Sequence, residues 1–131
     1  MQSPGFLREV IWDHDLTSVV KNSSILMYAD DVKLFLSFSN PSSCSILQED
    51  LNNFGNWCEF NLMSLNLKKC KTMSFYRGGY IQSNYQLFDV SLNVVTSIID
   101  LGITMDPKLS FTSHINKTIN KARLVLGFIK R

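Results

Sequence analysis

The chain has 131 residues, of which 45% are hydrophobic and 18% are charged, so one domain with a modest core is expected, and the composition does not suggest a disordered or collagen-like chain. A net charge of +2 is too small to indicate a nucleic-acid partner by itself. Three widely spaced cysteines and two distant histidines argue against both a disulfide framework and a zinc hydrolase. No apolar run reaches the roughly 18 residues of a membrane span, so we expect a soluble intracellular protein, with nucleus and cytoplasm both open.

The first third of the chain predicts a helix fragment, a loop and then a β-hairpin. Apolar residues at near-helical spacing in "FLREVI" are followed by a break at "DHDLTS". Next come "SILMYA" and "VKLFLSF", two β-prone runs with Asp30 and Asp31 between them, which predict a hairpin with a tight acidic turn. Both runs are apolar on nearly every residue, which is typical of strands covered on both faces.

A helix is predicted after the breaker residues "NPSS", where Ser45 and Gln48 have the spacing of a capping box. Apolar side chains at three- and four-residue steps predict a buried stripe of Leu47, Leu51, Phe54, Cys58 and Leu62. The other face is expected to meet water through Glu49, Asp50, Asn52, Asn53 and Asn56.

The second half predicts three strands and a final helix. The strand candidates are "KTMSFY", "NYQLF" and "SIIDLGITM", the last ended by the turn-forming pair "DP". Thr112 or Ser113 can cap the helix that follows, and its apolar stripe comprises Ile115, Ile119, Ala122, Leu126 and Ile129. Its basic residues fit a solvated face or a nucleic-acid contact equally well. The order of elements predicts an α+β fold with a mainly antiparallel sheet.

Two adjacent carboxylates in an apolar hairpin require an explanation. Asp30 and Asp31 repel each other, and burial of either without a partner would cost several kcal/mol. The pair must therefore face water, a cation or a basic partner, and a solvated turn is the simplest account. Carboxylates held at the end of a scaffolded hairpin are also hard oxygen ligands, which bind Mg²⁺ together with substrate phosphates and water. Phosphoryl transfer is the chemistry that uses this arrangement.

Four stretches in the same order carry a family resemblance. "YADD" within "LMYADDVKLF" resembles the catalytic hairpin of reverse transcriptases, specifically those of jockey-like non-LTR retrotransposons. "HDLTSVVKN" is similar to the lead-in to that hairpin, and "WCEFNLMSLNLKKCKTMSF" to the motif D region. "DLGITMDPKLSFTSHI" resembles the passage from palm to thumb. The resemblance implies that residues 1–111 form part of a palm, with an antiparallel sheet packed on helices, and that residues 112–131 begin the thumb as a basic amphipathic helix.

The resemblance also implies roles for individual residues. In the family, an RNA-directed DNA polymerase joins deoxynucleotide triphosphates to a DNA primer on an RNA template, using two Mg²⁺ ions, which Mn²⁺ can replace. Asp30 matches the catalytic metal ligand, and Asp31 matches its supporting neighbour in the same site. Tyr28 and Ala29 match positions beside the primer terminus, and Lys69 matches the lysine that meets the incoming triphosphate. The cations that would contact nucleic acid are Lys117, Lys121 and Arg123.

The chain also departs from the family pattern. The family's two-metal site needs a further aspartate from a separate strand upstream, and the fingers are not matched. Asp13 and Asp15 lie in "DHDL", which aligns with the start of the lead-in stretch, and they are not expected to replace that aspartate. Lys71 lies close enough to Lys69 to take its role, and "KKCK" fits a solvated basic turn equally well. We therefore expect a palm fragment that is inactive in isolation; the alternative is a non-catalytic nucleic-acid-binding or non-functional remnant.

Overall fold

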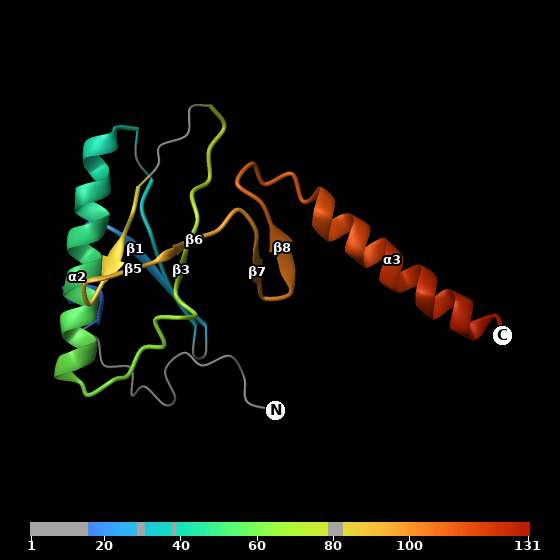
Figure 1. Cartoon of the computed structure of the whole chain (residues 1–131), viewed down its shortest axis with the longest axis horizontal. Coiled ribbons are helices and arrows are strands. Elements are labelled where there is room, and N and C mark those ends of the chain that lie inside the picture. The colour runs from blue at the N-terminus through green and yellow to red at the C-terminus, as the bar shows by residue number, and fades with distance from the viewer. Residues whose placement is uncertain (1–15, 29–30, 38, 79–82) are drawn as a thin grey trace. The chain divides into compact units, whose positions relative to one another are not determined.

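The computed structural model of the chain describes residues 16–28, 31–37, 39–78 and 83–131. The chain divides into a first unit, residues 1–72 with 83–93, and a second unit, residues 73–82 with 94–131. The described parts of both units contain helices and short antiparallel strand pairs, joined by turns and loops (Figure 1). The described structure is therefore α+β, as the order of predicted elements indicates. No helix in these ranges has the length and hydrophobicity needed to cross a lipid bilayer.

The predicted hairpin is confirmed in the first unit. Strand β1 (Ser24–Tyr28) pairs antiparallel with β2 (Asp31–Phe35), and the register runs from Ser24 opposite Phe35 to Tyr28 opposite Asp31. A short helix, α1 (Leu16–Val19), precedes it where the sequence predicted a loop. The helix fragment predicted around "FLREVI" lies outside the described residues.

The two faces of the hairpin have different environments. Ile25, Val32 and Leu34 pack against the core, whereas the opposite face is open to solvent. On that open face Leu26, Tyr28 and Phe35 are 58%, 64% and 48% exposed. The expectation that both faces are covered is therefore wrong for the described structure. Apolar residues on an open face give the same sequence pattern as a doubly covered strand, so the pattern alone cannot distinguish the two cases.

Helix α2 (Cys44–Phe60) belongs to the first unit and follows a 3₁₀ turn, η1 (Pro41–Ser43). The buried cluster joins this helix to α1 and comprises Leu16, Val20, Phe54 and Cys58. The predicted stripe is confirmed for its last two helical members, Phe54 and Cys58. Leu62 lies beyond the helix end and is 94% exposed, so its predicted burial is wrong.

The predicted capping box does not form. Ser43 is the N-cap residue and makes no side-chain cap, while the Ser45 hydroxyl donates to the Ser42 carbonyl oxygen at 2.7 Å. The Gln48 carboxamide instead reaches Gln86: its Oε1 accepts from the Gln86 N–H at 2.9 Å, and its Nε2 donates to the Gln86 carbonyl at 2.8 Å. The side chain thus links the helix to a strand rather than closing the helix start.

Short strands follow α2 in the chain. They are β3 (Lys71–Thr72), β4 (Gln86–Leu87), β5 (Val90–Ser91) and β6 (Asn93–Val94), so "KTMSFY" contributes only two strand residues. Strand β4 pairs with β5 through a two-residue loop, Phe88 and Asp89, whose φ angles are 52° and 60°. Positive φ at both loop residues is the signature of a type I′ turn, whose twist matches that of a hairpin.

Gly55 lets this hairpin approach α2 closely. A Cβ atom at residue 55 would lie 2.9 Å from Leu87 Cδ1 and 3.3 Å from the Phe88 ring. Leu87 is buried, so its side chain has little room to move away. A glycine inside a helix costs roughly 1 kcal/mol relative to alanine, and here that cost accompanies a close packing contact.

The second unit contains a hairpin that the sequence did not predict. Strands β7 (Ile98–Asp100) and β8 (Ile103–Met105) pair antiparallel, so the prediction of one continuous strand at "SIIDLGITM" is wrong. The loop residues Leu101 and Gly102 have φ angles of 46° and 83°, again as in a type I′ turn. Glycine favours this conformation, but leucine does not, which is why the turn is hard to recognise.

We expect Leu101→Asn to stabilise the β7–β8 hairpin by about 1 kcal/mol, because leucine with positive φ is strained and Asn-Gly is the preferred type I′ pair. The Leu101 side chain is largely exposed, so little packing is lost. Amide hydrogen exchange across β7 and β8 should slow by about fivefold. Leu101→Val is the control, since a β-branched residue is worse at positive φ; slower exchange in both variants would contradict the explanation.

Helix α3 (Thr112–Ile129) follows a turn organised by Asp106. The Asp106 carbonyl accepts from the Leu109 N–H at 2.9 Å, and its carboxylate accepts from the Ser110 hydroxyl at 2.6 Å. Hydrogen bonding from Ser110 holds the pKa of the Asp106 carboxyl below its ordinary value. Phe111, with φ 56°, is the N-cap residue. Thr112 and Ser113 are the first two residues of the helix, so the prediction that one of them caps it is wrong.

The contact between α3 and β8 is polar. The Thr104 N–H donates to His114 Nδ1 at 3.3 Å, and Lys117 Nζ donates to Thr104 Oγ1 at 3.4 Å. The predicted apolar stripe is exposed along its length, and no residue of α3 is buried. Within its own unit, the helix therefore turns part of its basic side, and not its apolar stripe, toward the neighbouring strand.

Candidate metal-binding hairpin

Two of the residues with predicted roles, Tyr28 and Asp31, lie at the end of the β1–β2 hairpin. Tyr28 is the last residue of β1 and Asp31 is the first residue of β2, and the two are cross-strand partners. Asp31 is half-buried, and Tyr28 is largely exposed. Ala29 and Asp30 lie outside the described residues. The structure thus places one of the two predicted metal ligands, at the end of a paired strand whose inner face packs on the core.

The donor chemistry of this hairpin fits part of a magnesium site. Mg²⁺ prefers oxygen ligands and is usually bound by one or two carboxylates, with phosphate oxygens and water completing an octahedron. Asp31 offers such a carboxylate, and Asp30 adjoins it in the sequence. Within the described ranges, no group of three or more His, Cys, Asp or Glu residues could hold a metal ion. The hairpin carboxylates would therefore need further donors, such as substrate phosphates.

Lys69 lies in a compact turn between α2 and β3. Its N–H donates to the Asn66 carbonyl at 2.9 Å, and the Cys70 N–H donates to the Leu67 carbonyl at 3.2 Å. The side chains of Lys69 and Lys71 are both exposed. Figure 1 draws this α2–β3 connection toward the same end of the first unit as the loop end of β1 and β2.

The three predicted nucleic-acid contacts lie on α3, in the second unit. Lys117 donates to Thr104, and its side chain is nevertheless exposed. Lys121 and Arg123 are exposed as well. All three remain accessible to an anionic partner.

Asp50 is a buried carboxylate that the sequence interpretation placed in water. The residue is 0% exposed, on α2. Its Oδ1 accepts from the Lys21 N–H at 3.1 Å, and its Oδ2 accepts from the N–H groups of Asn22 and Ser23 at 2.9 and 2.6 Å. These three residues lead directly into β1. A buried carboxylate therefore fixes the backbone at the start of the candidate hairpin.

The protonation of Asp50 follows from these contacts. Burial alone raises the pKa of its carboxyl, but hydrogen bonding from Ser23 and from the N–H groups of Lys21 and Asn22 outweighs burial, so the pKa lies below its ordinary value. The signal for its position was present in the sequence, because Asp50 is three residues after Leu47 and four before Phe54, on the apolar stripe itself. The prediction that Asp50 faces solvent is therefore wrong, because a charged side chain can also lie on the buried face when backbone N–H groups bind it.

The three cysteines are free and differ in environment. Burial, together with the nearby Cys70 thiol, raises the pKa of Cys58 to about 11, and burial also raises the pKa of Cys70. Cys44 is only half-buried, and its Sγ accepts from the Ser83 hydroxyl at 2.7 Å. Burial, followed by hydrogen bonding with Cys44, raises the pKa of Tyr85 to about 12.

We expect iodoacetamide to alkylate Cys44 first in the folded chain, with Cys58 and Cys70 slower by about 100-fold or more, because the thiolate is the reactive form and both are buried. Mass spectrometry of timed digests at pH 8 measures the order. In urea the three alkylation rates should converge. This control shows that the difference in the folded chain comes from burial and not from the residues next to each cysteine. Labelling of Cys58 at the rate of Cys44 without urea would contradict the described burial.

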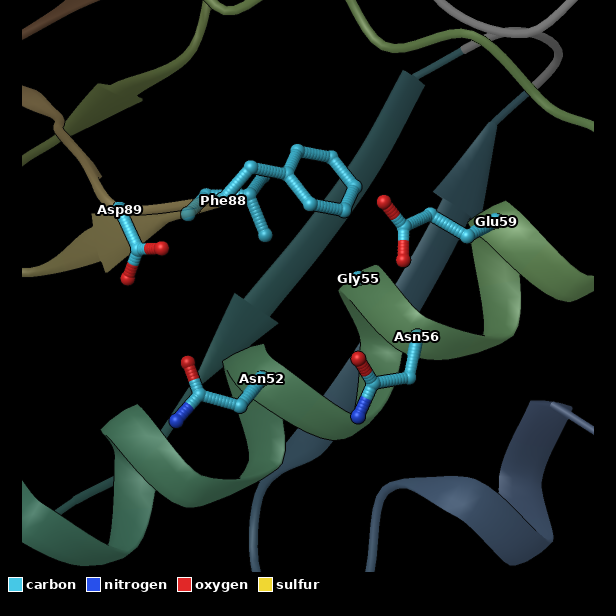
Figure 2. Close-up of a pocket in the computed structure, with 7 residues that line it drawn as sticks. Asn52, Gly55, Asn56, Glu59, Phe88 and Asp89 are labelled. Atoms are coloured by element: carbon cyan, nitrogen blue, oxygen red, sulfur yellow. The ribbon is translucent and has the colours of Figure 1, made fainter.

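A polar hollow of about 390 Å³ lies between α2 and the β4–β5 turn. Figure 2 shows Asn52, Asn56 and Glu59 along one side of the helix, facing Phe88 and Asp89. All five side chains are exposed, so water can solvate both carboxylates. The hollow contains none of the residues predicted to act in catalysis.

Comparisons with known proteins find no relative: no protein-family model, curated protein or solved structure matches the chain.

Proposed function

We propose that this chain contributes the "YADD" hairpin of a reverse transcriptase palm of the non-LTR, jockey-like type. In this proposal Asp30 and Asp31 form part of a two-metal site for nucleotidyl transfer, completed by an aspartate from a separate strand. The chain by itself is then inactive. The observation that supports the proposal best is the register of the hairpin, which pairs Tyr28 with Asp31 and places a carboxylate at the end of a strand packed on the core.

The residues of the chain have distinct tasks in this proposal. Bound Mg²⁺ would activate the primer 3′ oxygen and stabilise the leaving pyrophosphate. Asp31, with Asp30, would hold the metal by carboxylate oxygens. Tyr28, exposed opposite Asp31, would lie beside the primer terminus. Ala29, with its small side chain, would allow the primer strand to approach closely. Lys69, exposed in the turn before β3, would donate to the triphosphate.

Paramagnetic relaxation by Mn²⁺ tests the metal site without requiring turnover. We expect Mn²⁺, in the presence of a deoxynucleotide triphosphate, to broaden the amide signals of Tyr28 and Asp31 before those of other acidic segments. Asp30→Asn and Asp31→Asn should abolish this selectivity, because each removes a carboxylate oxygen ligand. Asp100→Asn, in the second unit, is the matched control and should leave the broadening at Tyr28 unchanged.

Equal broadening at the hairpin and around Glu49, Glu59 and Asp89 would contradict the proposal, because it would indicate unspecific attraction of a cation to carboxylates. Template-dependent primer extension by the isolated chain would contradict the second part of the proposal, that the site is incomplete.

A second candidate function is nucleic-acid binding without catalysis. It is favoured by the charge of residues 107–131, which contain several Lys and Arg and no Asp or Glu, with Lys121 and Arg123 exposed. Binding through phosphates should weaken steeply with salt and depend little on base sequence. Lys121→Gln with Arg123→Gln should reduce the salt slope, by about one unit for each phosphate that loses its cation. An affinity for single-stranded RNA that does not change with salt would rule this candidate out.

A further inference from the structure

We propose that Asp50 is a positioning residue that determines where the loop end of the β1–β2 hairpin, with Asp31, lies on the core. Asp50 is not among the residues for which the family resemblance implies a role. Its functional meaning rests on the proposed metal site, but its structural content can be tested independently.

The geometry begins with three consecutive backbone donors. The N–H groups of Lys21, Asn22 and Ser23 all point at one carboxylate, at 3.1, 2.9 and 2.6 Å. Three donors on one acceptor group fix both the direction and the position of the backbone, which a single hydrogen bond would not do. The next residue, Ser24, begins β1. The strand therefore starts from a point held to the middle of α2.

The β-ladder carries this position to the candidate site. Each residue of β1 has a partner on β2, ending with Tyr28 opposite Asp31. Ile25 on β1 and Val32 on β2 pack against the core, so a slip of one residue would turn them to the solvent face. Asp50 holds the start of β1, and the five residues of β1 then determine where Tyr28 lies. Because Tyr28 pairs with Asp31, the position of Asp31 is determined as well.

The chemistry of the residue supports a positional role. A buried charge adds little net stability compared with an apolar side chain of similar volume, because removal from water opposes the gain from pairing. An apolar residue at position 50 would fill the space but would leave three backbone donors without their acceptor. The Asp50 side chain extends from α2 far enough to contact the three backbone N–H groups, and its two carboxylate oxygens can accept hydrogen bonds from all of them.

The test compares Asp50→Asn with a core variant of similar stability. Asparagine has nearly the same shape, but its NH₂ group cannot accept from the N–H donors. We expect exchange of the Lys21, Asn22 and Ser23 amides to accelerate by about tenfold or more, and the amide signals of Tyr28 and Asp31 to shift. The apparent Mn²⁺ affinity at the hairpin should fall by about tenfold, as for other groups that orient metal ligands.

Two controls separate positioning from general stability. Phe54→Leu destabilises the same helix from within the core without removing the acceptor of the three N–H groups. Because Ile25 and Val32 pack against that core, it should move the Tyr28 and Asp31 amide shifts and the Mn²⁺ affinity, but clearly less than Asp50→Asn does. Glu49→Gln removes a neighbouring exposed charge and should change none of these readouts. All measurements are made on the full chain, under conditions where each variant is folded by circular dichroism.

The outcomes also separate this inference from the proposed function. If wild-type protein shows no selective Mn²⁺ broadening, the metal site is wrong, and the amide shifts of Tyr28 and Asp31 in Asp50→Asn still decide the positioning role. If those shifts stay unchanged, or if Phe54→Leu moves them equally, Asp50 does not position the hairpin end and the inference is overturned.

Discussion

Phe54→Ala should lower the free energy of unfolding by about 3–5 kcal/mol, as expected for truncation of a buried aromatic side chain. Phe54 is buried in the cluster that joins α1 to α2, together with Leu16, Val20 and Cys58. Truncation removes apolar area and leaves a cavity that close-packed neighbours cannot fill. Urea denaturation measures the loss, with the fluorescence of the neighbouring Trp57, which packs against the same cluster, as one probe.

The matched control is Phe60→Ala, near the end of the same helix. Phe60 is 87% exposed, so the same chemical change should alter stability by only about 0.5 kcal/mol. Both substitutions change the helix propensity of the residue by the same amount. The difference between their losses in stability therefore reports the burial of Phe54. Similar losses for both variants would mean that the described core is wrong.

Asp50→Asn should lower the free energy of unfolding by about 2–4 kcal/mol at neutral pH, because three backbone donors lose their charged acceptor. The effect should depend on pH in a defined direction. The pKa of the folded carboxyl lies below its ordinary value of 3.8, so the folded state holds the proton less tightly than the unfolded state. The stabilisation is therefore complete above the unfolded pKa and is lost as the pH falls through the folded pKa.

Denaturation of wild type and Asp50→Asn between pH 7 and pH 2 measures this dependence. The difference in stability should stay constant down to about pH 5 and shrink below it, since only the wild type has the carboxylate to lose. Glu49→Gln, on the exposed side of the helix, should show no comparable trend. A difference that stays constant to the lowest pH would show that the hydrogen bonds to the carboxylate do not depend on its charge.

The sequence predicted the elements that have a regular or strongly β-prone pattern of apolar residues. Helices α2 and α3 appear where the period-3.6 pattern places them, and the β1–β2 hairpin appears where two β-prone runs flank the acidic pair. The β7–β8 turn was not predicted, because Leu101 has a positive φ that leucine rarely adopts and only Gly102 marked the turn. The hydrogen bonds between β7 and β8 stabilise a turn conformation that leucine by itself disfavours. A short sequence window shows only the conformational preferences of its own residues, so it does not reveal this turn.

Burial was harder to predict than secondary structure. Asp50 was assigned to water because of its charge, although its spacing places it on the apolar stripe. The apolar stripe of α3 shows the converse case, since Ile115, Leu126 and Ile129 follow a regular pattern and yet are exposed. A pattern states which residues share a face, but the partner of that face depends on contacts distant in the sequence.

The position of two residues of the candidate site could be predicted from the sequence, while the roles of all its residues stay predictions. The sequence placed Tyr28 and Asp31 at a hairpin end, and the structure pairs them there. Asp30 and Ala29 lie outside the described residues, so their predicted roles stay predictions. The backbone support of the hairpin could not be predicted, because it joins residues 27 to 29 positions apart through a side chain on another element.

Gln48 has a consequence for how the first unit meets other chains. Its carboxamide occupies both the N–H and the carbonyl of Gln86, which point away from the β5 side of β4, where Leu87 pairs with Val90. A glutamine side chain thus takes the place of one residue of a third strand. An incoming extended segment would have to displace two hydrogen bonds of 2.9 and 2.8 Å before it could add to β4 at this position. This part of the strand is therefore protected against edge-to-edge aggregation by an uncharged side chain from the neighbouring helix.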